Sequence, residues 1–179
     1  CNIAGVRDGF SILDPYAGSC TTLLAAAMIA PACKKVAIEI AHNGLVNRDD
    51  VMRDFESRSL TPPLALIKGD STNASVRDEA RQHIHGKAFD IIIADPPYGI
   101  RESENYNEQD PISELCDSIA LDREAGKPLL RKGGKLVAFV PCTEEERIED
   151  CLPTDAKLDR AGLDILDMKE QPLNDKLSR

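Results

Sequence analysis

The stretch FDIIIAD (residues 89–95) decides the fold class of this chain. Three consecutive isoleucines inside an apolar run are typical of a strand that is buried on both faces of a sheet. A further segment, GLDILDMKEQ (162–171), also favours a strand. Comparable apolar runs occur along the chain at FSILD (10–14), KKVAIEI (34–40), ALIKGD (65–70) and GGKLVAFVP (133–141).

Helical patterns separate these runs. They cover TTLLAAAMIA (21–30), a polar segment that ends near residue 56, residues 75–83, residues 111–124 and TEEERIEDCL (143–152). Buried strands that alternate with helices predict an α/β fold with a mostly parallel central sheet and helices on both faces. There is no internal repeat and no composition break, so we expect a single domain over residues 1–179.

Composition limits the possible partners. The net charge is −9, and phosphate contacts supply most non-specific affinity for nucleic acids, so a nucleic-acid substrate would need basic surface from elsewhere. No two of the six cysteines have Cys-x-x-Cys spacing, and the three histidines complete no ligand set, so no metal is predicted. No apolar run is long enough to cross a bilayer, and we expect a cytoplasmic protein with no membrane partner.

An acidic residue closes or follows each of the first four predicted strands. They are Asp14, Glu39, Asp70 and Asp95. Because ligands of open α/β sheets bind beyond the carboxyl ends of the strands, we expect these carboxylates at one edge of the sheet. An acid after a strand is also a common helix N-cap. That alternative is weaker for the ordered set of four than for any single member.

The loop DPYAGSCTT (14–22) has neither the G-x-G-x-x-G nor the P-loop pattern, so it suits no pyrophosphate or triphosphate. Gly18 lets backbone approach a ligand closely, and Asp14 suits an ammonium group. Glu39 is placed to accept from ribose hydroxyls and Asp70 from an adenine amino group. A ligand with these three parts is S-adenosylmethionine. The predicted cofactor site comprises Asp14, Tyr16, Ala17, Gly18, Glu39, Ile40, Asp70, Ser71 and Asp95.

The next four residues, DPPY (95–98), are the predicted catalytic group: Asp95, Pro96, Pro97 and Tyr98. A carboxylate and a backbone carbonyl that accept from the two N–H groups of an amino nitrogen favour the form with a localised lone pair. Pro97 biases Pro96 toward an extended conformation, and Tyr98 offers a ring for base stacking, worth roughly 1–3 kcal/mol. The alternative is a turn that merely ends a strand.

The blocks DPYAG, VAIEI, GDST and DPPYG resemble the class I S-adenosylmethionine-dependent methyltransferases that modify exocyclic amino groups. DPPYGIRES (95–103), LLRKGGKLVAFVP (129–141) and EQPLNDKLSR (170–179) are similar to the catalytic domain of the tRNA guanine-N2 methyltransferases that act on guanosine at position ten. The resemblance implies a Rossmann-like class I methyltransferase fold. It also implies cofactor contacts at Asp14, Gly18, Glu39 and Asp70, and a target amino group at Asp95, Pro96 and Tyr98.

The same resemblance implies partners. The substrate would be tRNA, bound with the help of an N-terminal THUMP-type RNA-binding domain that these residues do not contain. Eukaryotic members also use a small zinc-containing activator subunit. The sequence departs from the family at Cys20, because the first motif reads GSC where Gly-Ser/Thr-Gly is common. We also expect the last sheet strand to be truncated after LSR (177–179).

The sequence therefore predicts S-adenosylmethionine-dependent methylation of an exocyclic amino group, with guanine N2 of tRNA as the target. Alternatives within the same chemistry are adenine N6, cytosine N4 and a protein glutamine. A non-catalytic methyltransferase-fold module that binds RNA or another subunit is the alternative from a different class. Arg101 and Glu102 are either part of a loop over the substrate, with Arg101 on an RNA phosphate, or a local ion pair.

Overall fold

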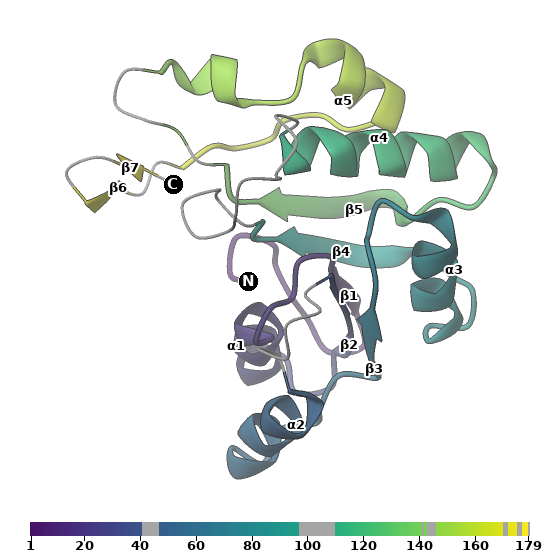
Figure 1. Ribbon diagram of the computed structural model, residues 1–179, viewed down its shortest axis with the longest axis vertical. Coiled ribbons are helices and arrows are strands. Elements are labelled where there is room, and N and C mark those ends of the chain that lie inside the picture. Colours follow the sequence, from purple (N-terminus) through teal and green to yellow (C-terminus); the bar gives the residue numbers. More distant parts are fainter. Residues whose placement is uncertain are drawn as a thin grey trace.

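The computed structural model describes residues 1–40, 47–96, 110–140, 142, 146–169, 172–174 and 177–178 (Figure 1). A five-stranded sheet forms the centre of the molecule, and the five apolar runs from residue 10 to residue 141 are confirmed as its strands. The fifth begins a few residues earlier than its apolar run indicated. The strands are β1 (Ser11–Asp14), β2 (Lys34–Glu39), β3 (Ala65–Lys68), β4 (Phe89–Ala94) and β5 (Leu130–Ala138).

All neighbouring strands of this sheet pair in parallel, in the order β3-β2-β1-β4-β5. The chain builds outward from β1 to β3 and then returns to place β4 on the other side of β1. The strand order therefore reverses between β1 and β4, and this switch point is where open α/β sheets bind their ligands. Every residue of β1 is buried, as expected for a strand covered on both faces.

Helices cover both faces of the sheet, which confirms the predicted α/β architecture. On one face α1 (Thr21–Ile29) and α2 (Arg48–Ser57) share a core with β1, in which Leu23 and Phe55 are buried. On the other face lie α3 (Ala74–Gln82), α4 (Pro111–Glu124) and α5 (Asp155–Ala161). Figure 1 shows α1 and α2 together to the lower left of β1 to β3, and α4 and α5 together above β5.

Side-chain caps fix where the helices start after the strand-end loops. The side chain of Asn47 accepts from Asp49 N at the start of α2, and that of Asn73 accepts from Ser75 N at the start of α3. Asp110 accepts from two backbone N–H groups of α4, whose first residue is a proline. Such caps satisfy N–H groups that have no partner inside the helix.

The region after β5 differs from its prediction. Of the predicted helix over 143–152, the described part holds only a 3₁₀ turn, Ile148–Cys151, and residues 146–150 are exposed. A helix that buries no face gains little from packing and is marginal in water. The helix α5, which was not predicted, follows it.

The strand predicted over 162–171 is also wrong, because residues 163–169 form no regular structure. Only Leu163 packs against the core, while Leu166 is 82 % exposed. An apolar run becomes a strand only where a neighbouring strand supplies hydrogen bonds, and the described residues 163–169 are paired with no strand. Two short strands, β6 (Pro172–Asn174) and β7 (Leu177–Ser178), instead pair with each other in a separate antiparallel sheet.

Among the described residues, no helix is both long and apolar enough to cross a membrane. In the same part of the chain, His, Cys, Asp and Glu side chains form no group of three or more that could hold a metal ion. The six cysteines are free thiols, and Cys20, Cys33 and Cys116 are buried.

Candidate active site

Two of the predicted acids flank the switch point of the sheet. Asp14 is the last residue of β1, and Asp95 directly follows β4, which pairs with β1. Asp14 is only 1 % exposed, whereas Asp95 is half-buried and the following Pro96 is buried. The sheet thus brings together the residues predicted to hold the amino-acid tail of the cofactor and the target amino group.

Asp14 is a strongly perturbed carboxyl group. Burial, above all, raises its pKa from 3.8 to about 7, and the nearby charges of Asp95 and Glu39 raise it further. Hydrogen bonds from Tyr16 N, at 3.1 Å, and from the Thr22 hydroxyl oppose this rise in pKa. Three carboxylates at adjacent strand ends therefore interact, and a cation placed between them would favour their charged forms.

A hydrogen bond between Gly18 and Glu39 links the loop after β1 to the end of β2. The N–H of Gly18 donates to Glu39 Oε2 at 2.6 Å, and the backbone of Gly18 is in the left-handed region with φ of +48°. Cys20, the residue before α1, has φ of +61°, a conformation that glycine adopts without cost. Burial and the charges of Asp14 and Glu39 raise the pKa of the Cys20 thiol to about 12, so it stays protonated.

Tyr16 and Ala17 fix the course of the same loop. Ala17 is buried and its N–H donates to Ile38 O in β2 at 2.9 Å. The Tyr16 hydroxyl donates to the Pro111 carbonyl at 2.8 Å, so the loop after β1 reaches the first turn of α4. These contacts place both predicted residues at the edge where Asp14 and Glu39 lie.

Asp70 and Ser71 continue the edge beyond β3. Asp70 is exposed, and its Oδ1 accepts from the backbone N–H and the hydroxyl of Thr72, both at 2.8 Å. Gly69, the residue before Asp70, packs closely against the side chain of Val76. A Cβ at position 69 would lie 2.8 Å from Val76 Cγ2, so a larger residue would clash there. Ser71, the next residue of the loop, is buried.

The remaining predicted site residues have different outcomes. Ile40 follows β2 directly and is 51 % exposed, so it lies at the predicted edge without being enclosed by it. Pro97, Tyr98, Arg101 and Glu102 lie outside the described residues. Their predicted roles are therefore carried forward as predictions.

Sequence reasoning missed the contribution of α4 to this edge. Glu114 lies in its first turn, and its pKa is raised by burial and then by the charge of Asp70. Sequence reasoning also missed the buried ion pair between Arg77 of α3 and Asp122 of α4. Arginines at positions 77 and 81, one helical turn apart, were the available signal, but their partner is distant in sequence.

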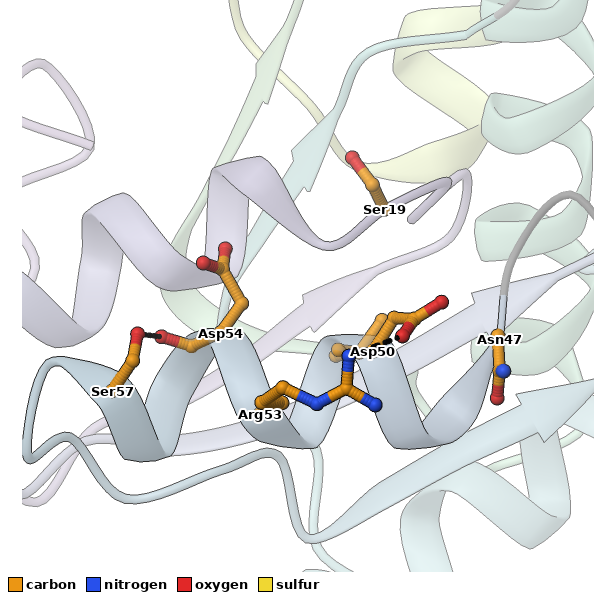
Figure 2. Close-up of a pocket in the computed structure, with 7 residues that line it drawn as sticks. Ser19, Asn47, Asp50, Arg53, Asp54 and Ser57 are labelled. Atoms are coloured by element: carbon orange, nitrogen blue, oxygen red, sulfur yellow. Dashed lines mark hydrogen bonds and ion pairs between the residues drawn. The ribbon is translucent and has the colours of Figure 1, made fainter.

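A groove of about 420 Å³ lies beside the loop after β1, between α1 and α2 (Figure 2). Ser19 comes from that loop, and the other lining residues belong to α2 or to its cap. The polar groups there pair with one another: Arg53 Nη1 lies 3.0 Å from Asp50 Oδ1, and Ser57 Oγ donates to Asp54 O at 2.9 Å. The strand-end carboxylates do not line this groove, so we do not assign the cofactor to it.

The described residues fit S-adenosylmethionine. Asp14 is a buried carboxylate for the ammonium group, and Glu39, fixed by Gly18, suits the ribose hydroxyls. Among the described residues, no hydrogen bond uses Asp70 Oδ2 or the N–H of Ser71. These two groups form an adjacent acceptor and donor, which match the amino group and N1 of adenine.

Solved structures share this fold at low sequence identity. TrmN from Thermus thermophilus matches with a TM-score of 0.51 and 22% identity over 76% of this chain, and the match spans 35% of TrmN. Precorrin-6y C5,15-methyltransferase from Geobacter metallireducens matches with a TM-score of 0.55 and 16% identity, covering 90% of this chain and 67% of that protein. A SAM-dependent methyltransferase from Aquifex aeolicus gives 0.53 and 12%, covering 99% and 83%.

Fold and sequence together define the class of protein. It is a class I methyltransferase with a Rossmann-like fold, and its cofactor is S-adenosylmethionine. More particularly, the sequence model described as "RMKL-like, methyltransferase domain" matches residues 1–152, and the chain belongs to that family. A search of the curated proteins found no match.

Proposed function

We propose that this domain transfers a methyl group from S-adenosylmethionine to the N2 amino group of guanine at position ten of tRNA. The observation that carries the proposal is the place of Asp95 and Pro96, directly after β4 and beside the buried Asp14 of β1. The choice of guanine rests on the similarity of DPPYGIRES and LLRKGGKLVAFVP to tRNA guanine-N2 methyltransferases. With tRNA as the substrate, we also propose that the protein acts in the cytoplasm.

The residues act mainly by orientation. When bound, S-adenosylmethionine supplies a methyl group on a positively charged sulfur. The Asp95 carboxylate and the Pro96 carbonyl would accept hydrogen bonds from the two N–H groups of the target, which directs the nitrogen lone pair at the methyl group. As the nitrogen takes the methyl group, it would lose one of these protons to the Asp95 carboxylate, which passes it to solvent. Holding both reactants in line removes much of the entropic cost of the reaction. A base within a helix would have to flip out to reach this edge.

The binding of RNA is a separate part of the proposal. The chain carries a net charge of −9 and gathers carboxylates around the site, which opposes the approach of a phosphate backbone. We therefore propose that a THUMP-type RNA-binding domain outside these residues supplies most of the affinity for tRNA. A small zinc-containing activator subunit is a second proposed source.

The test is a methylation assay on unmodified tRNA, followed by mass spectrometry of the nucleosides. The domain is assayed within its complete protein, with and without an activator subunit. We expect N2-methylguanosine, and its loss from a tRNA in which guanosine 10 is replaced by adenosine. Methyladenosine or methylcytidine in place of methylguanosine would assign the domain to one of the other base-methylating activities. Cofactor binding without any methyl transfer would favour a non-catalytic module.

A further inference from the structure

A buried ionic network lies between α3 and α4, behind the loop that carries Asp70. Arg77 is 1 % exposed and Asp122 is 5 % exposed. Arg77 Nε and Nη2 donate to the two carboxylate oxygens of Asp122 at 2.8 and 2.9 Å. Arg81 Nη1 donates to the same carboxylate at 2.8 Å, and its other end pairs with Asp78. A buried ion pair often adds little net stability, because the cost of removing the two charges from water offsets their attraction. The other contacts of Arg77 therefore matter for its role.

Arg77 also holds the backbone of the loop after β3. Its Nη1 donates to the carbonyls of Ser71 at 2.9 Å and Thr72 at 2.7 Å. Thr72 in turn donates its N–H and its hydroxyl to Asp70 Oδ1, both at 2.8 Å. A continuous chain of hydrogen bonds therefore runs from Asp122 through Arg77 and Thr72 to Asp70. Arg81, by contrast, has no hydrogen bond to the loop among the described contacts.

This arrangement has a consequence for the choice of nucleoside. With Oδ1 bound to Thr72, Asp70 offers Oδ2 as an acceptor, and the adjacent Ser71 offers its N–H as a donor. Adenine presents the complementary pair, an amino donor and the N1 acceptor. Hypoxanthine presents the reverse pair, an acceptor oxygen and an N1–H donor. When hypoxanthine binds, this fixed pair places Asp70 Oδ2 opposite an acceptor and the Ser71 N–H opposite a donor, so neither hydrogen bond forms.

We propose that Arg77, anchored on Asp122, is a positioning residue that fixes the Asp70–Thr72 loop and thereby makes the cofactor site selective for adenine. The inference rests on the proposed assignment of the adenine to this loop. Arginine suits the role because its planar fork spans a carboxylate and two carbonyls at once. A lysine at the same place has one point charge and cannot make the same set of contacts.

The test compares Arg77→Lys with the matched control Arg81→Lys. Both variants disturb the same buried carboxylate, and we expect similar losses of thermal stability. The readout is the ratio of the dissociation constants of S-inosylhomocysteine and S-adenosylhomocysteine, measured by calorimetry. We expect a preference for the adenosyl ligand of about thirtyfold in the wild type and in Arg81→Lys. In Arg77→Lys the preference should fall to within about threefold, through weaker binding of the adenosyl ligand.

The possible outcomes separate this inference from the cofactor assignment. An unchanged preference in folded Arg77→Lys, or an equal loss in Arg81→Lys, would overturn the positioning role while leaving the cofactor assignment intact. A folded wild type that binds neither ligand would overturn the cofactor assignment and, with it, this inference. If Arg77→Lys does not fold, Asp122→Asn weakens the anchor of Arg77 while Arg77, Thr72 and Asp70 themselves stay unchanged. A full preference in that folded variant would equally overturn the proposal, because the anchoring of Arg77 on Asp122 would then have no effect on the loop.

Discussion

The candidate site has two halves: a donor half, which would hold the methyl donor S-adenosylmethionine, and an acceptor half, which would hold the amino group that receives the methyl. The two halves are built differently. In the donor half, at the ends of β1, β2 and β3, each acid is fixed by a loop N–H: Asp14 by Tyr16, Glu39 by Gly18 and Asp70 by Thr72. In the acceptor half, Asp95 and Pro96 follow β4 directly, and β4 is held between β1 and β5. The carboxylates of the donor half are thus oriented by hydrogen bonds from loop N–H groups, and the residues of the acceptor half are placed by their position directly after a central strand. Substitutions in the two halves should therefore separate cofactor affinity from turnover.

The largest effect is expected at the acceptor half. Replacing Asp95 by alanine removes the carboxylate that accepts from the target amino group, and we expect methyl transfer at saturating cofactor to fall by about 100-fold or more. The affinity for S-adenosylhomocysteine should change far less. Asp90→Asn is the matched control, because Asp90 lies at the opposite end of β4 and binds Ser11. Undiminished turnover in Asp95→Ala would remove Asp95 from its proposed role.

A smaller effect is expected from Glu39→Gln in the donor half. The glutamine can still accept from Gly18 N but loses the charge that strengthens bonds to ribose hydroxyls, so the dissociation constant for S-adenosylhomocysteine should rise about tenfold. Turnover at saturating cofactor should be largely retained. Asp50→Asn, an exposed acid in the groove of Figure 2, is the control and should leave the affinity within about twofold. Equal effects of the two substitutions would contradict the assignment of Glu39.

The pH dependence of stability should reveal Asp14. Its pKa in the folded chain is about 7, above the ordinary 3.8, so its neutral form contributes stability below pH 3.8 that is lost as the pH rises through about 7. Between about pH 6 and about pH 8, the Tm should fall by roughly 3–5 °C more in the wild type than in Asp14→Asn. The measurement is thermal unfolding of both proteins without ligand. Parallel curves for the two proteins would show that Asp14 keeps an ordinary pKa.

The smallest effect is expected at Cys20, the point where the first motif departs from the related family. Its thiol is buried and has a pKa of about 12, so it supplies neither a nucleophile nor a charge at neutral pH. Cys20→Ala should change the cofactor affinity and the turnover by less than about threefold. A loss as large as that of Asp95→Ala would instead make Cys20 part of the reaction chemistry.

Whether a feature could be predicted from the sequence depends on how far apart in the chain its interacting residues lie. The strands β1 to β4 are recognisable because a strand buried on both faces needs a continuous apolar run, and the acids at their ends are local features of the sequence. The ion pair of Arg77 with Asp122 joins residues 45 positions apart, and no local pattern specifies it. The contact of Tyr16 with Pro111 spans 95 positions and was hidden for the same reason.

In the region after β5 the error is of the opposite kind, because local sequence patterns predicted regular elements that the described residues do not form. Ile165, Leu166 and Met168 form an apolar run typical of a strand, yet all three are exposed and no strand pairs with them. The acidic segment before Cys151 has helix-forming residues, but its described part, residues 146–150, is exposed and buries no face. Propensity decides neither case, because both kinds of element depend on packing against a neighbour.

Calorimetric titration of the folded chain with S-adenosylhomocysteine, beside Glu39→Gln and Asp95→Ala, tests whether the two halves of the site have separate roles. We expect one binding site per chain, with an affinity that falls about tenfold in Glu39→Gln and changes little in Asp95→Ala. Absence of binding to a folded chain, or a loss of affinity in Asp95→Ala as large as that in Glu39→Gln, would contradict the division of this edge into a donor half and an acceptor half.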